Sequence, residues 1–94
     1  MSSTVELPRT GPPGSGLGGA WRVIVLNDDV NTFEGVAFAL SRTLPGVSYD
    51  RGLSIANRIH RSGRALVWSG HRELAELYWE QLAGFGLTLA PLER

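Results

Sequence analysis

The chain lacks cysteine, lysine and any long apolar run. Without cysteine it forms no disulfides, thiolate metal sites or cysteine nucleophile, which fits a reducing compartment. All nine basic residues are arginine, so there is no side-chain amine for Schiff-base chemistry or lysine modification. No stretch approaches the roughly 18 apolar residues of a membrane span, and the N-terminus lacks a signal-peptide pattern. We therefore expect a cytoplasmic protein without a membrane partner.

Positive and negative charges balance, with nine basic and nine acidic residues and a formal net charge of zero. This balance gives no broad electrostatic reason to bind nucleic acid or anionic lipid. The 94 residues suffice for one small domain. Residues 1–20 include the run GPPGSGLGG (Gly11–Gly19), whose glycine and proline content predicts a disordered tail. Residues 21–94 are then expected to form the folded domain.

The remaining sequence alternates between strand and helix patterns. Trp21–Leu26 is apolar and rich in β-branched residues, as in a largely buried strand. Asn31 is predicted to cap the following helix, with Glu34 as its capping-box partner, and Pro45-Gly46 ends that helix. The later elements are a helix from about Ser48–Asp50 to Gly63, a strand over Arg64–Trp68, a helix over His71–Ala83 and a short strand over Leu87–Ala90.

The order strand, helix, helix, strand, helix, strand limits how the sheet can be built. Two helices separate the first two strands, so these should run in opposite directions, whereas the last two strands, separated by one helix, should run the same way. Placing the first strand between the other two makes every neighbouring pair antiparallel. We therefore predict an α+β fold of two layers, with a three-stranded antiparallel sheet covered on one face by three helices.

Three polar residues, Asn27, Asp28 and Asp29, directly follow the first strand. Taken alone, they are explained by Asx turns, in which such side chains bond local backbone amides. His60, in the last turn of the second helix, is similarly explained by the helix dipole. If the fold brings His60 to the polar turn, the carbonyl, carboxylate and imidazole acceptors would together suit a ligand with a positive amine and a hydrophobic group beside it.

The same residues allow a metal site as a further interpretation. Asp28, Asp29 and His60 are the ligand types of a two-carboxylate, one-histidine site, although adjacent carboxylates at a strand end point apart. The sequence has no G-x-S-x-G elbow and no phosphate-binding P-loop. We therefore predict no catalytic residue, no metal and no cofactor, and we keep a metal-dependent enzyme as an alternative.

The third helix carries an acidic row, Glu73, Glu76 and Glu80. A row of this kind is usually a solvated face, and it can also serve as a surface for a partner protein. The helical period predicts that the opposite side faces the core with the apolar residues Leu74, Leu77, Tyr78 and Leu82.

Three segments of the chain resemble a known protein family. VIVLNDD (Val23–Asp29), IHRSGRA (Ile59–Ala65) and ELAE (Glu73–Glu76) look like ClpS, the adaptor that delivers N-degron substrates to ATP-dependent Clp proteases. The similarity extends from Trp21 to about Leu92. It implies three antiparallel strands, three helices and no catalytic activity, and we expect a monomer.

The resemblance also implies a binding site for the N-terminus of a peptide. Asn27, Asp28 and His60 would hold the free α-amino group, and Asp29 would support the turn. The first residue of the peptide would be a large hydrophobic one, namely leucine, phenylalanine, tyrosine or tryptophan. Its side chain would enter a pocket formed by Asn31, Phe33, Val36, Ala56 and Ile59.

Partner binding is implied by the same resemblance. Glu73 and Glu76 would lie where the family docks on the N-terminal domain of a ClpA- or ClpC-type unfoldase, and the tail would help to hand over cargo. The chain departs from the usual family pattern at Asn31, Phe33 and Ala56, which leaves the preferred first residue open. The remaining alternative is an interaction domain of this fold that binds no N-degron, since the fold also resembles the C-terminal domain of the ribosomal stalk protein.

Overall fold

The chain folds into three helices and three strands in the predicted order. The computed structural model describes residues 20–94, so the expected tail lies outside the described residues except for Ala20. Between residues 20 and 94, no helix is both long and apolar enough to cross a membrane. The elements are β1 (Trp21–Leu26), α1 (Phe33–Thr43), α2 (Tyr49–Ser62), β2 (Arg64–Gly70), α3 (Arg72–Gly84) and β3 (Thr88–Leu89).

The sheet has the order β2-β1-β3, and both neighbouring pairs are antiparallel. Val25 lies at its centre, paired with Ala65 on one side and with Leu89 on the other. β2 is longer than predicted, because Gly70 pairs with Trp21. β3 is shorter than predicted, because the pairing with β1 covers only two residues. The predicted arrangement of the strands is confirmed.

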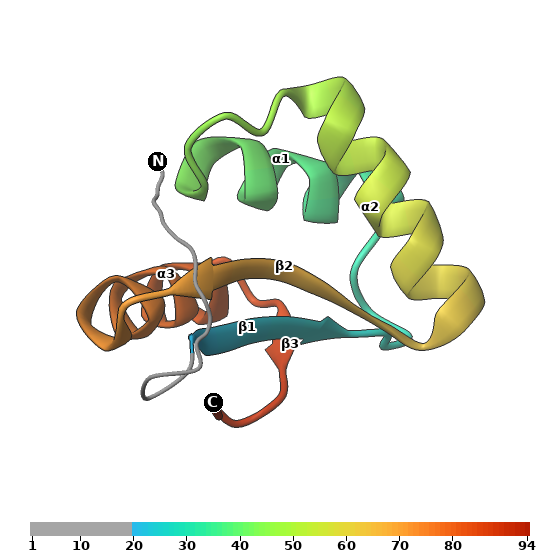
Figure 1. The fold of residues 1–94 in the computed structure, drawn as a ribbon. Coiled ribbons are helices and arrows are strands. Elements are labelled where there is room, and N and C mark those ends of the chain that lie inside the picture. Colours follow the sequence, from blue (N-terminus) through green and yellow to red (C-terminus); the bar gives the residue numbers. More distant parts are fainter. Residues whose placement is uncertain (1–19) are drawn as a thin grey trace.

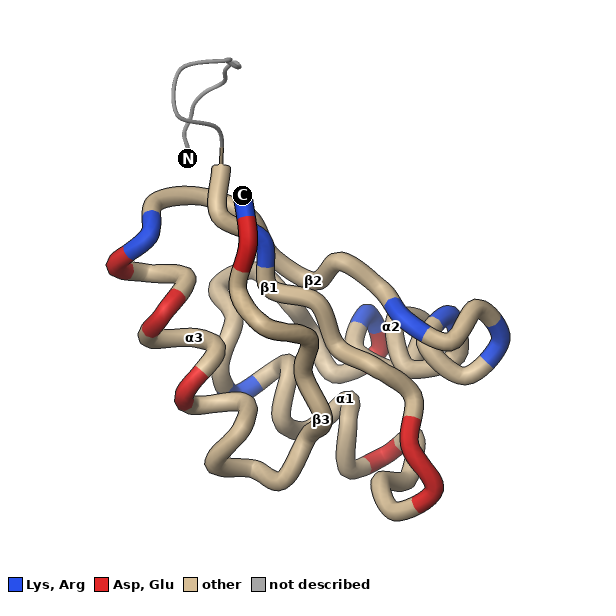
Figure 2. The backbone as a smooth tube through the Cα atoms, turned by 90° about the horizontal axis from the view of Figure 1, so that it is seen from below, with Lys and Arg blue, Asp and Glu red and all other residues tan. Residues whose placement is uncertain are grey.

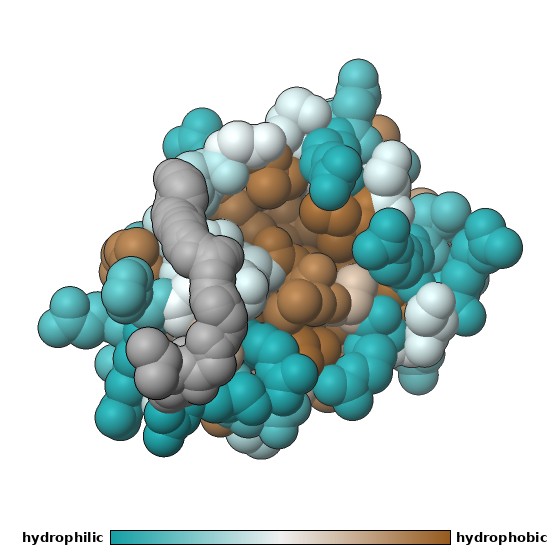
Figure 3. All heavy atoms as spheres, viewed as in Figure 1, coloured by the Kyte–Doolittle hydropathy of each residue, from teal (hydrophilic) through white to brown (hydrophobic). Residues whose placement is uncertain are grey.

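One apolar cluster joins the sheet to all three helices. α1 and α2 lie above the sheet in Figure 1, and α3 lies behind it. Seen from this side, apolar side chains gather between the upper helices and the sheet, surrounded by hydrophilic ones (Figure 3). Because every helix contributes to a single core with the same face of the sheet, the two-layer α+β prediction is confirmed. The members from the sheet are Val23, Val25 and Ala65, and those from the helices are Val36, Ala39, Leu40, Ala56, Ile59, Ala75 and Leu82.

The start of α1 differs from the prediction. Thr32, rather than Asn31, is the N-cap, and its Oγ1 accepts a hydrogen bond from the backbone N–H of Gly35 at 2.9 Å. The predicted capping box of Asn31 with Glu34 is therefore wrong. Threonine and asparagine are both good N-caps, and the Asn31 side chain has partners elsewhere in the fold that the local sequence cannot reveal.

The orientation of α3 also differs from the prediction. Leu74 and Leu77 are 41% and 45% exposed, whereas Ala75 and Leu82 are buried. Close approach of this helix to the rest of the core explains the difference, because the small Ala75 side chain, with no exposed surface, faces the core. The expectation that Leu74 and Leu77 point inward was therefore wrong, and that for Leu82 was right.

Gly52 allows α1 and α2 to pack closely. A Cβ atom at this position would lie 2.8 Å from the backbone oxygen of Ala37 and 2.9 Å from its Cα. Real Cβ atoms essentially never come so close to backbone atoms, so a larger residue would push the helices apart. This close approach sets the position of α2, and with it that of His60.

We predict that Gly52→Ala lowers the free energy of unfolding by about 1–3 kcal/mol through overpacking, despite the roughly 1 kcal/mol that alanine gains over glycine in a helix. Urea unfolding followed by circular dichroism measures the change. Gly84→Ala, in α3, is the matched control, because a Cβ there meets nothing within 4 Å. Equal stability of Gly52→Ala and the parent would contradict the close approach of the helices.

Candidate functional site

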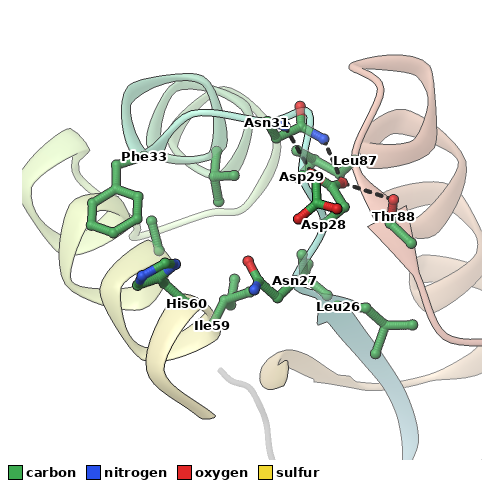
Figure 4. Close-up of a pocket in the computed structure, with 13 residues that line it drawn as sticks. Leu26, Asn27, Asp28, Asp29, Asn31, Phe33, Ile59, His60, Leu87 and Thr88 are labelled. Atoms are coloured by element: carbon green, nitrogen blue, oxygen red, sulfur yellow. Dashed lines mark hydrogen bonds between the residues drawn. The ribbon is translucent and has the colours of Figure 1, made fainter. Parts of the chain in front are cut away.

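A cavity of about 310 Å³ opens where the end of β1, the start of α1 and the last turns of α2 meet. Figure 4 shows side chains from these elements and from the start of β3 around it. Every residue predicted for the amino-group, turn and side-chain positions lines this cavity, and the roles of these residues in binding stay predictions. They are Asn27, Asp28, Asp29, Asn31, Phe33, Val36, Ala56, Ile59 and His60.

Sequence reasoning missed four lining residues, Val25, Leu26, Leu87 and Thr88. Thr88 pairs with Leu26 across the antiparallel β1–β3 ladder. The predicted placement of β1 beside β3 could therefore have indicated that a residue of β3 such as Thr88 lines the cavity. The register that puts it opposite Leu26 is visible only in the structure.

The C-terminal end of α2 holds His60 near the polar turn. Gly63 caps this helix in the left-handed conformation, with φ of 88°, which glycine adopts without steric cost. The backbone carbonyl of Gly63 then accepts a hydrogen bond from the backbone N–H of Asn27 at 2.9 Å. This bond ties the end of β1 directly to the end of α2. The Asn27 side chain points toward His60 across the cavity (Figure 4).

The Asp28 carboxylate is fully engaged in hydrogen bonds within the protein. Oδ1 accepts from the backbone N–H groups of Val30 and Asn31 at 2.9 and 2.8 Å. Oδ2 accepts from Asn31 Nδ2 at 2.7 Å and from Thr88 Oγ1 at 2.8 Å. The backbone N–H of Asn31 is the largest cause that lowers the pKa of Asp28 to about 2, and the other three donors add to it against the opposing effect of burial. Asp28 therefore stays ionised at neutral pH.

The same network links the loop after β1 to the segment that leads into β3. Asn31 Nδ2 also donates to the backbone carbonyl of Gly86 at 2.9 Å. We call Asp28, Val30, Asn31, Gly86 and Thr88, with these bonds, the Asp28 network. The bonds that hold the turn are thus made by Asp28. Asp29, which was expected to support the turn, forms no hydrogen bond or ion pair with the residues that the structure describes.

The inner wall of the cavity is apolar. Val36, Ala56 and Ile59 are buried and belong to the core cluster. Phe33 stands at the rim, 39% exposed, and its ring meets the His60 imidazole edge to face, with centroids 5.3 Å apart and planes at 63°. The cavity therefore combines polar acceptors at its mouth with an apolar interior, an arrangement that suits a ligand with one charged end.

A metal site does not form at this position. Asp28, Asp29 and His60 do not make a group that could hold a metal ion, and residues 20–94 contain no other such group. Both oxygens of Asp28 are occupied by the hydrogen bonds described above. The two-carboxylate, one-histidine alternative therefore has no support in the geometry.

The acidic row of α3 lies on the outside of the molecule. Figure 2 shows acidic residues along α3, whereas arginines gather around α2 and the start of β2. Glu73 and Glu80 are exposed, and Glu76 Oε2 pairs with Arg72 Nε at 3.0 Å. The predicted role of Glu73 and Glu76 in docking stays a prediction.

Comparison with known proteins identifies the family. The model of the family described as "ATP-dependent Clp protease adaptor protein ClpS" matches residues 18–90. The chain belongs to the ClpS family. The predicted resemblance is therefore confirmed, and membership makes the protein an adaptor with a Clp protease as its partner.

Curated relatives and a solved structure agree with this assignment. ClpS of Thermosynechococcus vestitus is 52% identical over 73 residues, which cover 78% of each chain. ClpS of a Synechocystis species is 50% identical over 74 residues, 79% of this chain and 76% of the relative. The fold matches the structure of Agrobacterium tumefaciens ClpS2 bound to L-phenylalaninamide with a TM-score of 0.69 and 29% identity, over 80% of this chain and 98% of that one.

We predict that Asp28→Asn reduces stability at neutral pH by about 1–2 kcal/mol, because the lost hydrogen bonds are charge-assisted. Since the pKa of Asp28 is about 2 in the folded protein, below the value of about 3.9 for an unfolded chain, its stabilisation is complete above pH of about 4. It is lost as the pH falls toward 2.

Urea unfolding at pH of about 6 and about 2.5 tests this prediction. The stability gap between the parent and Asp28→Asn should narrow at the lower pH. Asp29→Asn is the control, because its carboxylate accepts no hydrogen bond from the described residues. A gap of the same size at both pH values, or an equal effect of Asp29→Asn, would contradict the Asp28 network.

Proposed function

We propose that the cavity binds the free α-amino group and the large hydrophobic first residue of N-degron substrates, which the protein then delivers to a Clp-type unfoldase. One observation carries the proposal: Asn27 and His60, far apart in the sequence, line one cavity whose inner wall is apolar. The solved ClpS2 structure has L-phenylalaninamide bound, a ligand with a free α-amino group and an aromatic side chain.

The α-amino group of a peptide is mostly charged at neutral pH and has three N–H donors. In our proposal, the Asn27 side-chain carbonyl and a neutral nitrogen of the His60 imidazole accept two of them. Asp28 acts mainly through its charge, because its oxygens already accept four hydrogen bonds and its low pKa of about 2 keeps it ionised. Asp29, which lines the same cavity, offers acceptors for the third donor, directly or through water.

The apolar interior selects the first side chain. A volume of about 310 Å³ is at the lower end of the range for small-ligand sites and accommodates one large side chain. Ala56 is small and buried, so it leaves depth in the pocket. Val36, Ile59 and the Phe33 ring supply the remaining apolar contacts. Leucine, phenylalanine, tyrosine and tryptophan are the first residues that fill such a space.

The expected affinity follows from two favourable terms and one cost. Each charge-assisted hydrogen bond contributes about 1.5–3 kcal/mol, and burial of a leucine or phenylalanine side chain contributes about 1.5–3 kcal/mol. Ordering of the peptide offsets part of this gain. The balance corresponds to micromolar binding, or about −8 kcal/mol.

Delivery requires a second surface, away from the cavity. We propose that Glu73 and Glu76 of α3 dock on the N-terminal domain of a ClpA- or ClpC-type unfoldase, with the protein acting as a monomer in the cytoplasm. The support is that Glu73 is exposed, that the Glu76 side chain is 47% exposed and that neither glutamate lines the cavity. Residues 1–20 would help in the transfer of cargo. In this proposal, the protein binds and delivers without catalysing a reaction.

We predict that a fluorescein-labelled peptide beginning with phenylalanine binds with micromolar Kd in fluorescence anisotropy. Its N-acetylated form should bind at least about 10-fold more weakly, because acetylation removes the charge and two of the donors. Asn27→Ala and His60→Ala should each weaken binding of the free peptide. Asn57→Ala and His71→Ala are matched controls, because these exposed residues lie outside the cavity, and they should bind like the parent.

The outcome separates this proposal from an interaction domain that binds no N-degron. Equal binding of the free and acetylated peptides would refute recognition of the amine. Normal binding of a Clp unfoldase by a protein that ignores both peptides would favour the interaction domain instead.

A further inference from the structure

Phe33 and His60 both line the cavity, and their rings are in contact. Their rings meet edge to face with centroids 5.3 Å apart, a geometry that aromatic pairs prefer. The two residues come from different helices, with Phe33 at the start of α1 and His60 in the last turn of α2. Figure 4 shows the rings together on one side of the cavity, with the Asn27 side chain directed toward His60.

Among residues 20–94, no hydrogen bond or ion pair holds the His60 ring. The residue is also exposed. An exposed side chain without such contacts samples several rotamers. Among the described residues, the Phe33 ring is the aromatic partner of the His60 imidazole.

Phe33, in contrast, follows two residues whose hydrogen bonds fix the local backbone. It is the first residue of α1 and follows the N-cap Thr32, whose Oγ1 accepts from Gly35 N–H. Asn31, which comes directly before Thr32, forms three hydrogen bonds to Asp28 and Gly86. The Asp28 network and the Thr32 cap thus fix the backbone from which the Phe33 side chain projects.

The exposure of Phe33 argues against a purely packing role. Phe33 is 39% exposed, whereas Val36, Ala37 and Leu40 of the same helix are buried. Phe33 is also absent from the core cluster. The Phe33 ring therefore contributes less to the core than these residues do, and it remains available to contact His60.

We propose that Phe33 is a positioning residue for His60, holding the imidazole so that one nitrogen faces the cavity mouth opposite Asn27. This inference rests on the proposed binding of an α-amino group. Phe33 acts through the imidazole, and its ring fixes the acceptor before the peptide arrives. The entropy that an unrestrained His60 would lose on binding is thereby reduced.

A double-mutant cycle tests whether Phe33 acts through His60. The probe is the fluorescein-labelled peptide beginning with phenylalanine, and the variants are Phe33→Leu, His60→Ala and their combination. Leucine keeps apolar bulk and removes the ring. We expect Phe33→Leu to raise Kd by about 2- to 12-fold in the parent and to have a clearly smaller effect when His60 is alanine. Phe33→Tyr, which keeps the ring, should restore the parental Kd within about twofold.

The control is Phe38→Leu. Phe38 is another partly exposed phenylalanine of α1 with an edge-to-face partner, Phe85, and it lies outside the cavity. The Phe38→Leu substitution should leave the Kd for the peptide unchanged. Equal effects of Phe33→Leu in both His60 backgrounds would show that Phe33 is only a wall of the pocket and would overturn the proposal.

A second readout needs no peptide and therefore separates this inference from the proposed function. In NMR spectra of the free protein, the His60 ring protons should show cross-relaxation with the Phe33 ring and a ring-current shift. Phe33→Leu should move these resonances toward those of an unrestrained histidine, and Phe38→Leu should not. Unchanged His60 resonances in Phe33→Leu would contradict the positioning role even if the protein binds peptides.

Discussion

The four hydrogen bonds accepted by the Asp28 carboxylate are the constraint on which the candidate site depends. They close the loop after β1, attach it to Thr88 of β3 and, through Asn31, to the carbonyl of Gly86. Asn27, on one side of this loop, is also bonded through its backbone to Gly63 at the end of α2. Phe33, on the other side, begins α1. One carboxylate thus holds the loop that connects these two sides of the cavity, and its pKa of about 2 keeps it charged at neutral pH.

The fold was predictable because each element has a clear local signal and the order of elements permits few sheets. The apolar run Trp21–Leu26 and the left-handed Gly63 are examples, and the central place of β1 followed from strand direction alone. Two errors share one cause. Asn31 has a tertiary hydrogen-bond partner at Gly86, and Leu74 is left at the surface where Ala75 packs. In both places, contacts distant in the sequence decide between local patterns of similar quality.

The sequence pointed to nine of the thirteen residues that line the cavity, but it did not show which of them hold the loop in place. From the sequence, either carboxylate of the polar turn could support the loop. The structure shows that Asp28 accepts the hydrogen bonds of the loop, whereas Asp29 has no partner among the described residues. Likewise, the pairing of the Phe33 and His60 rings depends on how closely α1 and α2 pack, which Gly52 permits. Such distances between elements are not encoded in any short motif.

We propose that a charged amine binds at the cavity mouth between Asn27 and His60, with the Asp28 network intact. A crystal structure of the protein with L-phenylalaninamide tests it most directly. We expect the amine nitrogen within about 3 Å of the Asn27 side-chain oxygen and of an imidazole nitrogen of His60, and the aromatic ring beside Ala56. A ligand bound elsewhere, or bound here with its amine turned to solvent, would contradict it.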